Sequence, residues 1–445
     1  MRCFARRTLA LAMLLATCRA AAAQDYSGRE KLRAQSSEFR KEIIRVTDGV
    51  YVAVGYAASN VILIQGDGGS IVVDTGTDPV AARAIRTAFG NLFAAPVRAI
   101  IYTHSHPDHT GGSRVFAGDD RPEIYGHQRF GAAPDIGRAD RDGGDQFGMT
   151  LPDSVYINAG VQLEFGRITP PTRDGYLPPT RTVSGDRTSL TIAGVRLQLL
   201  ETPGETTDAI SVWLPDTHVL MPGDDFFRAF PNISPMRGAR SRSPEDWIAS
   251  LDKMIDLAPE AVVPGHTRPV LGPDAAHAAL TAYRDGIKSV MEQTIDGMKK
   301  GERPDELVRH VRLPSSLAEN PYLEEFYGSV EWTVRGIYAD RLGWFDGNAT
   351  NLFPLPEKDR AARLVGLIGG PDQVLARGRD ALTAGDFTWA AELADYVLAN
   401  DGANATAKRI KARALTELGE RQINAIARNY YLSSAMFLLR DLPPQ

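Results

Sequence analysis

The stretch Thr103-His104-Ser105-His106-Pro107-Asp108-His109-Thr110-Gly111-Gly112 decides the fold of this 445-residue chain. It holds three of the eight histidines within ten residues, which argues against chance clustering on a surface loop. Residues 97–102, directly before it, are largely apolar and rich in β-branched side chains, and such a run predicts a buried strand. The histidines therefore stand on a loop at the end of a strand.

The spacing within this stretch suits two metal ions. His104 and His106 are two positions apart, so on extended backbone both side chains point the same way. Pro107 then turns the chain, which lets the adjacent Asp108 and His109 face a second position. Two imidazoles at one point, with a carboxylate and an imidazole nearby, suit a pair of Zn²⁺ ions that activate water for hydrolysis.

Other strands end in residues of the same kind. The apolar run 219–223 leads into Asp224, and the run 261–264 leads to His266. Glu205 follows an earlier strand after a Pro-Gly turn, although it could also simply cap that turn. Alternating strands and helices with such residues at strand ends indicate a layered α/β domain whose site lies along one sheet edge.

The length and a hydrophobic share of 43% predict two or three domains with sizeable cores. We expect a signal peptide at residues 1–23, an α/β catalytic domain at 24–275 and an all-α domain at 276–445. The Gly- and Pro-rich segment 128–185 is expected to wall the active site. Helical periodicity predicts helices over residues 75–90, 274–299, 327–342, 371–384, 387–399 and 403–418.

Residues 1–23 combine a basic start, a short apolar run and small residues at their end, as a secretory signal peptide does. We expect cleavage after Ala23, by either general or twin-arginine export, and a periplasmic or secreted protein. The apolar run is too short for a permanent anchor, so no stable membrane insertion is expected after cleavage. Both cysteines, Cys3 and Cys18, lie in this segment, so we expect neither disulfides nor thiolate ligands in the mature chain.

The charge balance limits the class of partner. Without the four arginines of residues 1–23, the chain has 46 basic against 55 acidic residues, a formal charge of −9. This balance argues against nucleic acid as a general partner. An anionic substrate would have to be bound by local arginines.

With Asp224 and His266 at later strand ends, the motif of residues 103–109 resembles that of the metallo-β-lactamase superfamily. Within it the sequence is similar to the alkyl sulfatases, the SDS hydrolases. The further stretches that carry this similarity are Val46-Thr47-Asp48-Gly49-Val50-Tyr51, Arg237-Gly238-Ala239, Trp247 and Leu342-Gly343-Trp344-Phe345-Asp346-Gly347-Asn348. The resemblance implies an αββα sandwich followed by an all-α dimerisation domain, and hence a homodimer. Alkyl sulfatases usually continue into a sterol-carrier-like domain, which we expect this chain to lack because its sequence ends at Gln445.

The resemblance also implies the ligands of two Zn²⁺ ions, position by position. One ion would be held by His104, His106 and Glu205. The other would be held by Asp108, His109 and His266. Asp224 would bridge the two ions, and together with Asp108 it would hold the metal-bridging hydroxide that attacks the substrate.

The charges of such a centre assign a role to arginines. Three ligand carboxylates and a bridging hydroxide would cancel the four positive charges of two Zn²⁺ ions, so arginines must bind the sulfate group. Arg237 and Arg242 match the sulfate-side arginines of the family and suit a tetrahedral anion, unless they are solvated surface charges. Asn232 keeps its family position, and Arg228 is a further candidate. Because Arg228 stands where the family usually has a histidine, the identity of the proton donor stays open.

Three further expectations concern the surroundings of the ligands. Asp74, at a strand end, is expected to orient a metal-binding histidine through a hydrogen bond. Asp225 is expected to stay outside the ligand set. Phe226, Phe227 and Phe230 either form an apolar wall for an alkyl tail or belong to the core.

The sequence thus predicts a secreted binuclear zinc hydrolase that cleaves alkyl sulfate esters such as SDS to an alcohol and inorganic sulfate. In one alternative, the same site acts on another anionic ester, an aryl sulfate, a β-lactam or a lactone. Glu205 and the helical domain argue against a β-lactamase. In a second alternative the chain is a non-catalytic binding or scaffold protein, which is disfavoured because no ligand position is missing.

Overall fold

The computed structural model describes residues 25–93, 96–131, 151–163, 173–236, 238 and 242–443. The expected signal peptide and Arg237 lie outside these residues, as do parts of the segment 128–185 that was expected to wall the site.

The first of two central sheets has its strands in sequence order. They are β1 (Glu42–Thr47), β2 (Val50–Val54), β3 (Val61–Gly66), β4 (Gly69–Val73), β5 (Val97–Ile101), β6 (Glu123–His127) and β7 (Arg181–Val183). Neighbouring strands are antiparallel from β1 to β4 and parallel from β4 to β7. The loops after β4 and β5 therefore leave the sheet at the same edge.

The second sheet has the order β13-β12-β11-β10-β9-β8. Its strands are β8 (Arg187–Ile192), β9 (Val195–Glu201), β10 (Ile210–Leu214), β11 (Val219–Gly223), β12 (Ala261–Pro264) and β13 (Val270–Leu271). Only β11 and β12 pair in parallel among the described strands of this sheet. Their carboxyl ends, which carry Asp224 and His266, thus lie at one edge.

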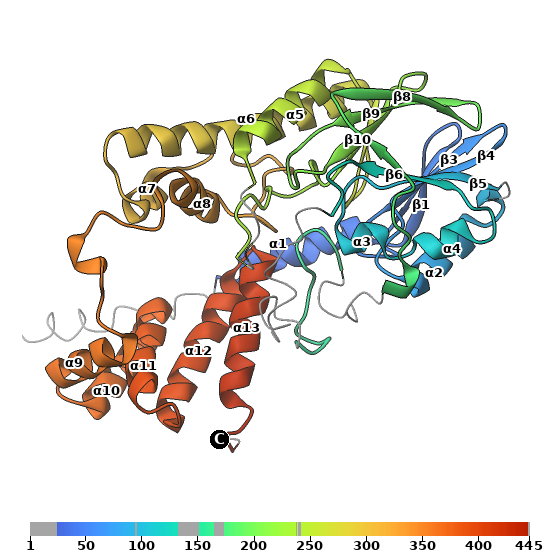
Figure 1. Cartoon of the computed structure of the whole chain (residues 1–445). Coiled ribbons are helices and arrows are strands. Elements are labelled where there is room, and N and C mark those ends of the chain that lie inside the picture. The colour runs from blue at the N-terminus through green and yellow to red at the C-terminus, as the bar shows by residue number, and fades with distance from the viewer. Residues whose placement is uncertain are drawn as a thin grey trace, which may run out of the picture.

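Successive residues of a strand point to opposite faces, and here both faces are buried. Val73 of the first sheet packs with Met221 of the second between the sheets. Its neighbour Val72 belongs to the core that faces α2 and α4, and Leu220 belongs to the core that faces α5 and α6. These helices are α2 (Pro79–Phe89), α4 (Ser113–Ala117), α5 (Pro244–Asp256) and α6 (Pro273–Lys299). The layers follow the predicted αββα order (Figure 1).

Helix α2 begins later than predicted. A helix was expected from residue 75, but Asp78 accepts hydrogen bonds from the backbone nitrogens of Val80 and Ala81, and Pro79 occupies the first helical position. The residues directly before this cap do not continue the helix and instead contact the histidine loop of residues 103–112. The backbone nitrogen of Thr75 donates to the carbonyl of His109, which ties the end of β4 to the loop of residues 103–112.

The C-terminal helices form two groups. They are α6, α7 (Pro304–His310), α8 (Val330–Leu342), α9 (Glu357–Ile368), α10 (Pro371–Ala384), α11 (Phe387–Asn400), α12 (Ala405–Arg421) and α13 (Ala425–Leu439). Helices α6, α7 and α8 share the apolar core of α5 and the second sheet, whereas α10 to α13 share a separate one. Helices α7, α9 and α13 were not predicted from the sequence. None of the described helices is both long and apolar enough to span a membrane.

The N-terminal helix α1 (Ser27–Gln35) packs between the sandwich and the last helices. Leu32 is fully buried in a cluster with Phe227, which follows β11, and Ile426 of α13. Arg29 forms an ion pair of 2.6 Å with Glu420 of α12. Helix α1 therefore packs against both the sandwich and the last helices, as Figure 1 shows.

Candidate metal centre

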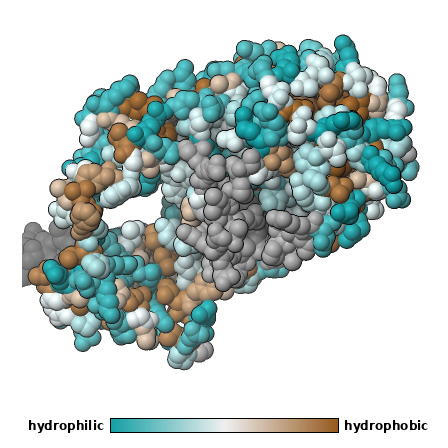
Figure 2. Space-filling view, in the orientation of Figure 1, coloured by the Kyte–Doolittle hydropathy of each residue, from teal (hydrophilic) through white to brown (hydrophobic). Residues whose placement is uncertain are grey.

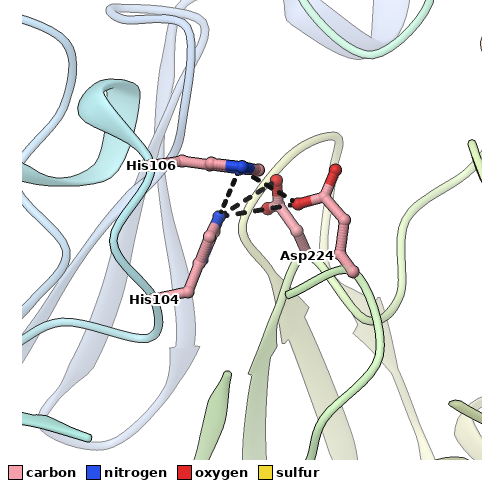
Figure 3. Close-up of side chains that lie close together, drawn as sticks. His104, His106 and Asp224 are labelled. Atoms are coloured by element: carbon pink, nitrogen blue, oxygen red, sulfur yellow. Dashed lines mark hydrogen bonds and ion pairs between the residues drawn. The ribbon is translucent and has the colours of Figure 1, made fainter. Parts of the chain in front are cut away.

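All seven predicted ligands lie together at one edge of the sandwich. They are His104, His106, Asp108 and His109 after β5, Glu205 between β9 and β10, Asp224 after β11 and His266 after β12. Asp108 and His109 lie on the short helix α3 (Pro107–Thr110), which starts at the predicted Pro107 turn. Figure 3 shows His104 and His106 of the first sheet pointing toward Asp224 of the second.

The first group of ligand atoms is spaced for one ion. His104 Nε2 lies 2.9 Å from His106 Nδ1, and Glu205 Oε2 lies 3.5 and 3.3 Å from these two atoms. Asp224 Oδ2 lies 3.8 Å from His104 Nε2. Zinc–ligand bonds of about 2.0–2.1 Å in a tetrahedron separate neighbouring ligand atoms by about 3.3 Å. The four atoms fit such a sphere.

The second group has similar spacings. Asp108 Oδ2 lies 3.8 Å from His109 Nε2 and 3.6 Å from His266 Nε2. The Asp224 carboxylate reaches this group as well, with Oδ1 3.3 Å from His109 Nε2 and Oδ2 3.1 Å from His266 Nε2. Asp224 thus lies between both groups, where a bridging ligand would have to be.

Unpaired buried atoms test whether the residues fit metal ions. His109 Nε2, Glu205 Oε2 and Asp224 Oδ1 are buried and have no hydrogen-bond partner. Buried polar atoms without partners are costly and rare in proteins. All three point into the cluster, where a pair of divalent cations would satisfy them. The residues therefore fit a pair of divalent metal ions.

Asp74 holds one ligand in place, as predicted. Its Oδ2 accepts a hydrogen bond of 2.8 Å from His109 Nδ1, and its two oxygens also accept bonds from the backbone nitrogen and hydroxyl of Thr103. His266 Nδ1 donates to the carbonyl of Ala58 at 2.8 Å. These partners fix the protons on Nδ1, so the Nε2 lone pairs of His109 and His266 face the cluster.

Asp225 stays outside the ligand set, as expected. Its Oδ1 accepts a hydrogen bond of 2.8 Å from the backbone nitrogen of Glu205. Burial, together with the negative charges of Glu205 and Asp224, raises the pKa of Asp225 well above its ordinary value. A neutral carboxyl supports the Glu205 loop without adding charge to the cluster.

His104 and Asp224 are in the protonation states that metal binding requires. Burial, with the neighbouring imidazoles of His109 and His106, lowers the pKa of His104 to about 4. Although burial alone would raise it, the imidazoles of His109 and His266 hold the pKa of Asp224 well below its ordinary value. At neutral pH His104 therefore offers a lone pair and Asp224 a negative charge. Although burial alone would lower it, the carboxylates of Asp224, Asp74 and Asp108 raise the pKa of His109 well above its ordinary value, so His109 would release a proton when an ion binds.

Arg242 lies against a candidate ligand. Its Nη1 donates hydrogen bonds of 2.8 Å to Glu205 Oε1 and to the carbonyl of Asn232, and its side chain is 3% exposed. The alternative that Arg242 is a solvated surface charge is therefore wrong. Its predicted contact with the substrate stays a prediction.

The other predicted sulfate-binding residues differ in their surroundings. Asn232 is buried, and its Oδ1 has no hydrogen-bond partner. The Arg228 guanidinium is partly exposed and pairs with Glu38 of the N-terminal segment at 2.8 Å. The structure brings Asn232 next to Arg242, whereas Arg228 is engaged by a residue that the sequence did not single out.

The three phenylalanines after Asp225 belong to the core. Phe226 and Phe230 pack with the residues of α5 and α6, and Phe227 packs with Leu32 of α1. All three are at most 1% exposed. Of the two interpretations, the core one applies, and these side chains do not form an open wall for an alkyl tail.

One positioning residue was not predicted from the sequence. The Asn60 amide donates to the carbonyls of Pro264 and Thr267, and its backbone nitrogen donates to the carbonyl of Gly265. It fixes the loop that carries His266. The available signal was a polar residue directly before the apolar run of β3.

Two family models match the chain. Residues 54–266 match the metallo-beta-lactamase superfamily, and residues 303–441 match the alkyl sulfatase dimerisation family.

Curated relatives and solved structures agree with these matches. The linear primary-alkylsulfatase of Pseudomonas sp. (strain ATCC 19151) is 36% identical over 391 residues, which are 84% of this chain and 73% of that protein. An (R)-specific secondary-alkylsulfatase of Pseudomonas sp. is 30% identical, over 90% of this chain and 63% of that protein. The solved stereoselective inverting sec-alkylsulfatase from Pseudomonas sp. matches 91% of this chain and 66% of its own, with a TM-score of 0.82 and 27% identity. This chain thus spans about two thirds to three quarters of their lengths.

The Asp74 contact predicts the effect of a conservative substitution. Asp74 adopts a positive φ of 55°, which asparagine tolerates, so Asp74→Asn should fold. Its amide cannot accept all three hydrogen bonds, so we expect zinc affinity to fall about 10–100-fold. Competition with a chromogenic chelator measures this. Asp67→Asn, in the exposed turn between β3 and β4, is the control, and equal affinities for the two variants would contradict the assignment.

Proposed function

Because this chain belongs to the alkyl sulfatase family of the metallo-β-lactamase superfamily, we propose that it is a zinc hydrolase of alkyl sulfate esters. The products would be an alcohol and inorganic sulfate. The observation that carries this proposal is the cluster of seven His, Asp and Glu ligands with three buried atoms that lack partners. Such a set belongs to a hydrolytic metal site.

When bound, two divalent ions would lower the pKa of a coordinated water and polarise the sulfate group. The chain's own residues prepare the site for them. Burial keeps His104 unprotonated, and the partners of His109 and His266 keep each Nε2 lone pair turned inward. Zinc is the proposed metal because the ligand atoms are imidazole nitrogens and carboxylate oxygens, which catalytic zinc sites combine.

Other substrates of the same site are the main alternative. An aryl sulfate, a lactone or a β-lactam would need the same activated water. The match of residues 303–441 to the alkyl sulfatase dimerisation family supports the alkyl sulfate, because this helical part accompanies the fold in that family. Glu205, in place of a histidine, also argues against a β-lactamase.

Metal-dependent sulfate release tests the function. We expect the purified, zinc-loaded protein to release sulfate from dodecyl sulfate, to lose this activity after chelation and to regain it with Zn²⁺, because the ligand atoms need an ion to activate water. Ion chromatography of sulfate measures it. Turnover of nitrocefin or an aryl sulfate without turnover of dodecyl sulfate would contradict the proposal.

We further propose a homodimer that uses the connector between α8 and α9. This connector surface consists of Trp344, Leu352, Phe353 and Leu355 on the connector, with Leu342 at the end of α8 and Leu367 in α9. Phe353 is 96% exposed, Leu367 84% and Trp344 75%. Figure 2 shows apolar residues on this connector, beside an opening between it and the last helices. An exposed apolar surface of this kind indicates a protein interface, and the dimerisation family match supports a second copy as the partner.

Charges on the connector surface should separate the subunits. In a symmetric dimer the same surface is buried on both copies, so one change acts twice. We expect the double variant Trp344→Asp, Phe353→Asp to elute with the mass of one chain instead of two in size-exclusion chromatography with light scattering. Val80→Asp, at a 70% exposed position on α2, is the control. A wild-type monomer, or a dimeric double variant, would contradict the proposal.

Export is proposed from the composition of residues 1–23, a basic start followed by an apolar run and small residues. The mature protein should then begin at Gln24 and accumulate outside the cytoplasm. Mass spectrometry of the N-terminus after cell fractionation measures both. A cytoplasmic protein that retains residues 1–23 would count against export.

A further inference from the structure

We propose that Arg242 is a positioning residue that holds the Glu205 carboxylate in the orientation in which it binds a metal ion. This inference rests on the proposed metal site, and it concerns how this chain builds that site.

The two oxygens of Glu205 have separate roles. Oε1 accepts the hydrogen bond of 2.8 Å from Arg242 Nη1. Oε2 lies 3.3 Å from His106 Nδ1 and 3.5 Å from His104 Nε2, and it is buried without a hydrogen-bond partner. A carboxylate with one oxygen fixed by a guanidinium cannot turn away from the histidines, so the guanidinium selects which oxygen faces the ion.

Arg242 is itself held in place. Its Nη1 also donates to the carbonyl of Asn232 at 2.8 Å. The next residue, Ser243, caps α5 by accepting a hydrogen bond from the backbone nitrogen of Asp246. Arg242 thus directly precedes the residue that caps helix α5.

The same helix fixes the backbone of the Glu205 loop. Ser250 donates to the carbonyl of Pro203, and the Trp247 indole donates to the carbonyl of Asp225, whose side chain accepts from the Glu205 backbone nitrogen. Helix α5 therefore holds the backbone of the Glu205 loop, and Arg242, directly before the helix, holds the Glu205 side chain. Together these contacts fix both the backbone and the side chain of Glu205.

Burial explains why the pair is needed. The side chains of Arg242 and Glu205 are each 3% exposed. A buried carboxylate beside Asp224 would lack solvation and a counter-charge on the side away from the ion. Arg242 supplies that counter-charge, so Glu205 can stay ionised and directed at the ion in the assembled site.

Site-selective zinc loss tests the proposal. We expect Arg242→Met to weaken zinc binding about tenfold at the Glu205 group while the group of Asp108, His109 and His266 keeps its affinity. Zinc content after dialysis against a graded chelator series, measured by mass spectrometry, should pass through one ion per chain, whereas the wild type keeps two. Arg428→Met is the matched control, because Arg428 is equally buried and pairs at 3.0 Å with Glu420, a contact that joins α13 to α12 and not to any candidate ligand.

A double-mutant cycle shows whether Arg242 acts through Glu205. In a Glu205→Gln background, Arg242→Met should cause little further loss of zinc, because the carboxylate it positions is gone. If Arg242→Met does not fold, Arg242→Lys takes its place in the cycle, since it keeps the charge but ends short of Glu205. Arg242→Lys should lower the zinc affinity of the Glu205 group less than Arg242→Met does.

The kinetic constants separate positioning from substrate binding. With saturating zinc, Arg242→Met should keep the KM for dodecyl sulfate within about twofold and lower kcat. A tenfold rise in KM with unchanged zinc affinity would overturn the proposal in favour of direct sulfate binding, and two zinc ions at wild-type affinity would also overturn it. A wild-type protein that binds zinc but releases no sulfate would refute the proposed function alone, and the zinc titration would still decide the role of Arg242.

Discussion

The structure depends on the close contact of the Asp224 carboxylate with histidines that follow strands of both sheets. This carboxylate follows β11, yet it lies 3.3 Å from His109 of the first sheet and 3.1 Å from His266 of the second. Gly265 makes the approach possible, because a Cβ there would lie 2.3 Å from Asp224 Oδ1. The apolar side chains packed between the two sheets fix the position of one sheet relative to the other. The same packing therefore sets the distances between ligands that come from different sheets.

Buried polar side chains hold the loops that carry the ligands in fixed positions relative to the strands. Asp74 ties His109 to Thr103, Asn60 ties the His266 loop to the start of β3, and Asp225 ties the Glu205 loop to the end of β11. Each of them uses side-chain oxygens or amides on backbone groups that no strand partner satisfies. The loops that hold the ligands are therefore as well supported as the strands, which suits a site that must bind ions without rearrangement.

The sequence predicted what depends on local pattern and missed what depends on tertiary contact. Strand-end histidines and carboxylates identified the ligand positions, and helical periodicity identified α10 and α11. The early start assigned to α2 failed because Asp78 caps the helix and the Thr-Gly-Thr run before it has poor helical propensity. The partner of Arg242 could not be read from sequence, since Glu205 is 37 residues away. The pairing of Arg228 with Glu38 likewise joins segments 190 residues apart.

The position of Arg242 changes how the site would attract an anion. Counting only ligands, two divalent ions and a bridging hydroxide are balanced by Glu205, Asp108 and Asp224, so the centre itself would be neutral. With a guanidinium 2.8 Å from Glu205, the charge of that carboxylate would be offset from behind, whereas Asp74 adds a negative charge beside His109, so the Glu205 side of the assembled centre would be the more positive one. A sulfate ester carries a single negative charge, so it would be attracted to the Glu205 side of the centre even though Arg242 Nη1 is bonded to Glu205 and Asn232.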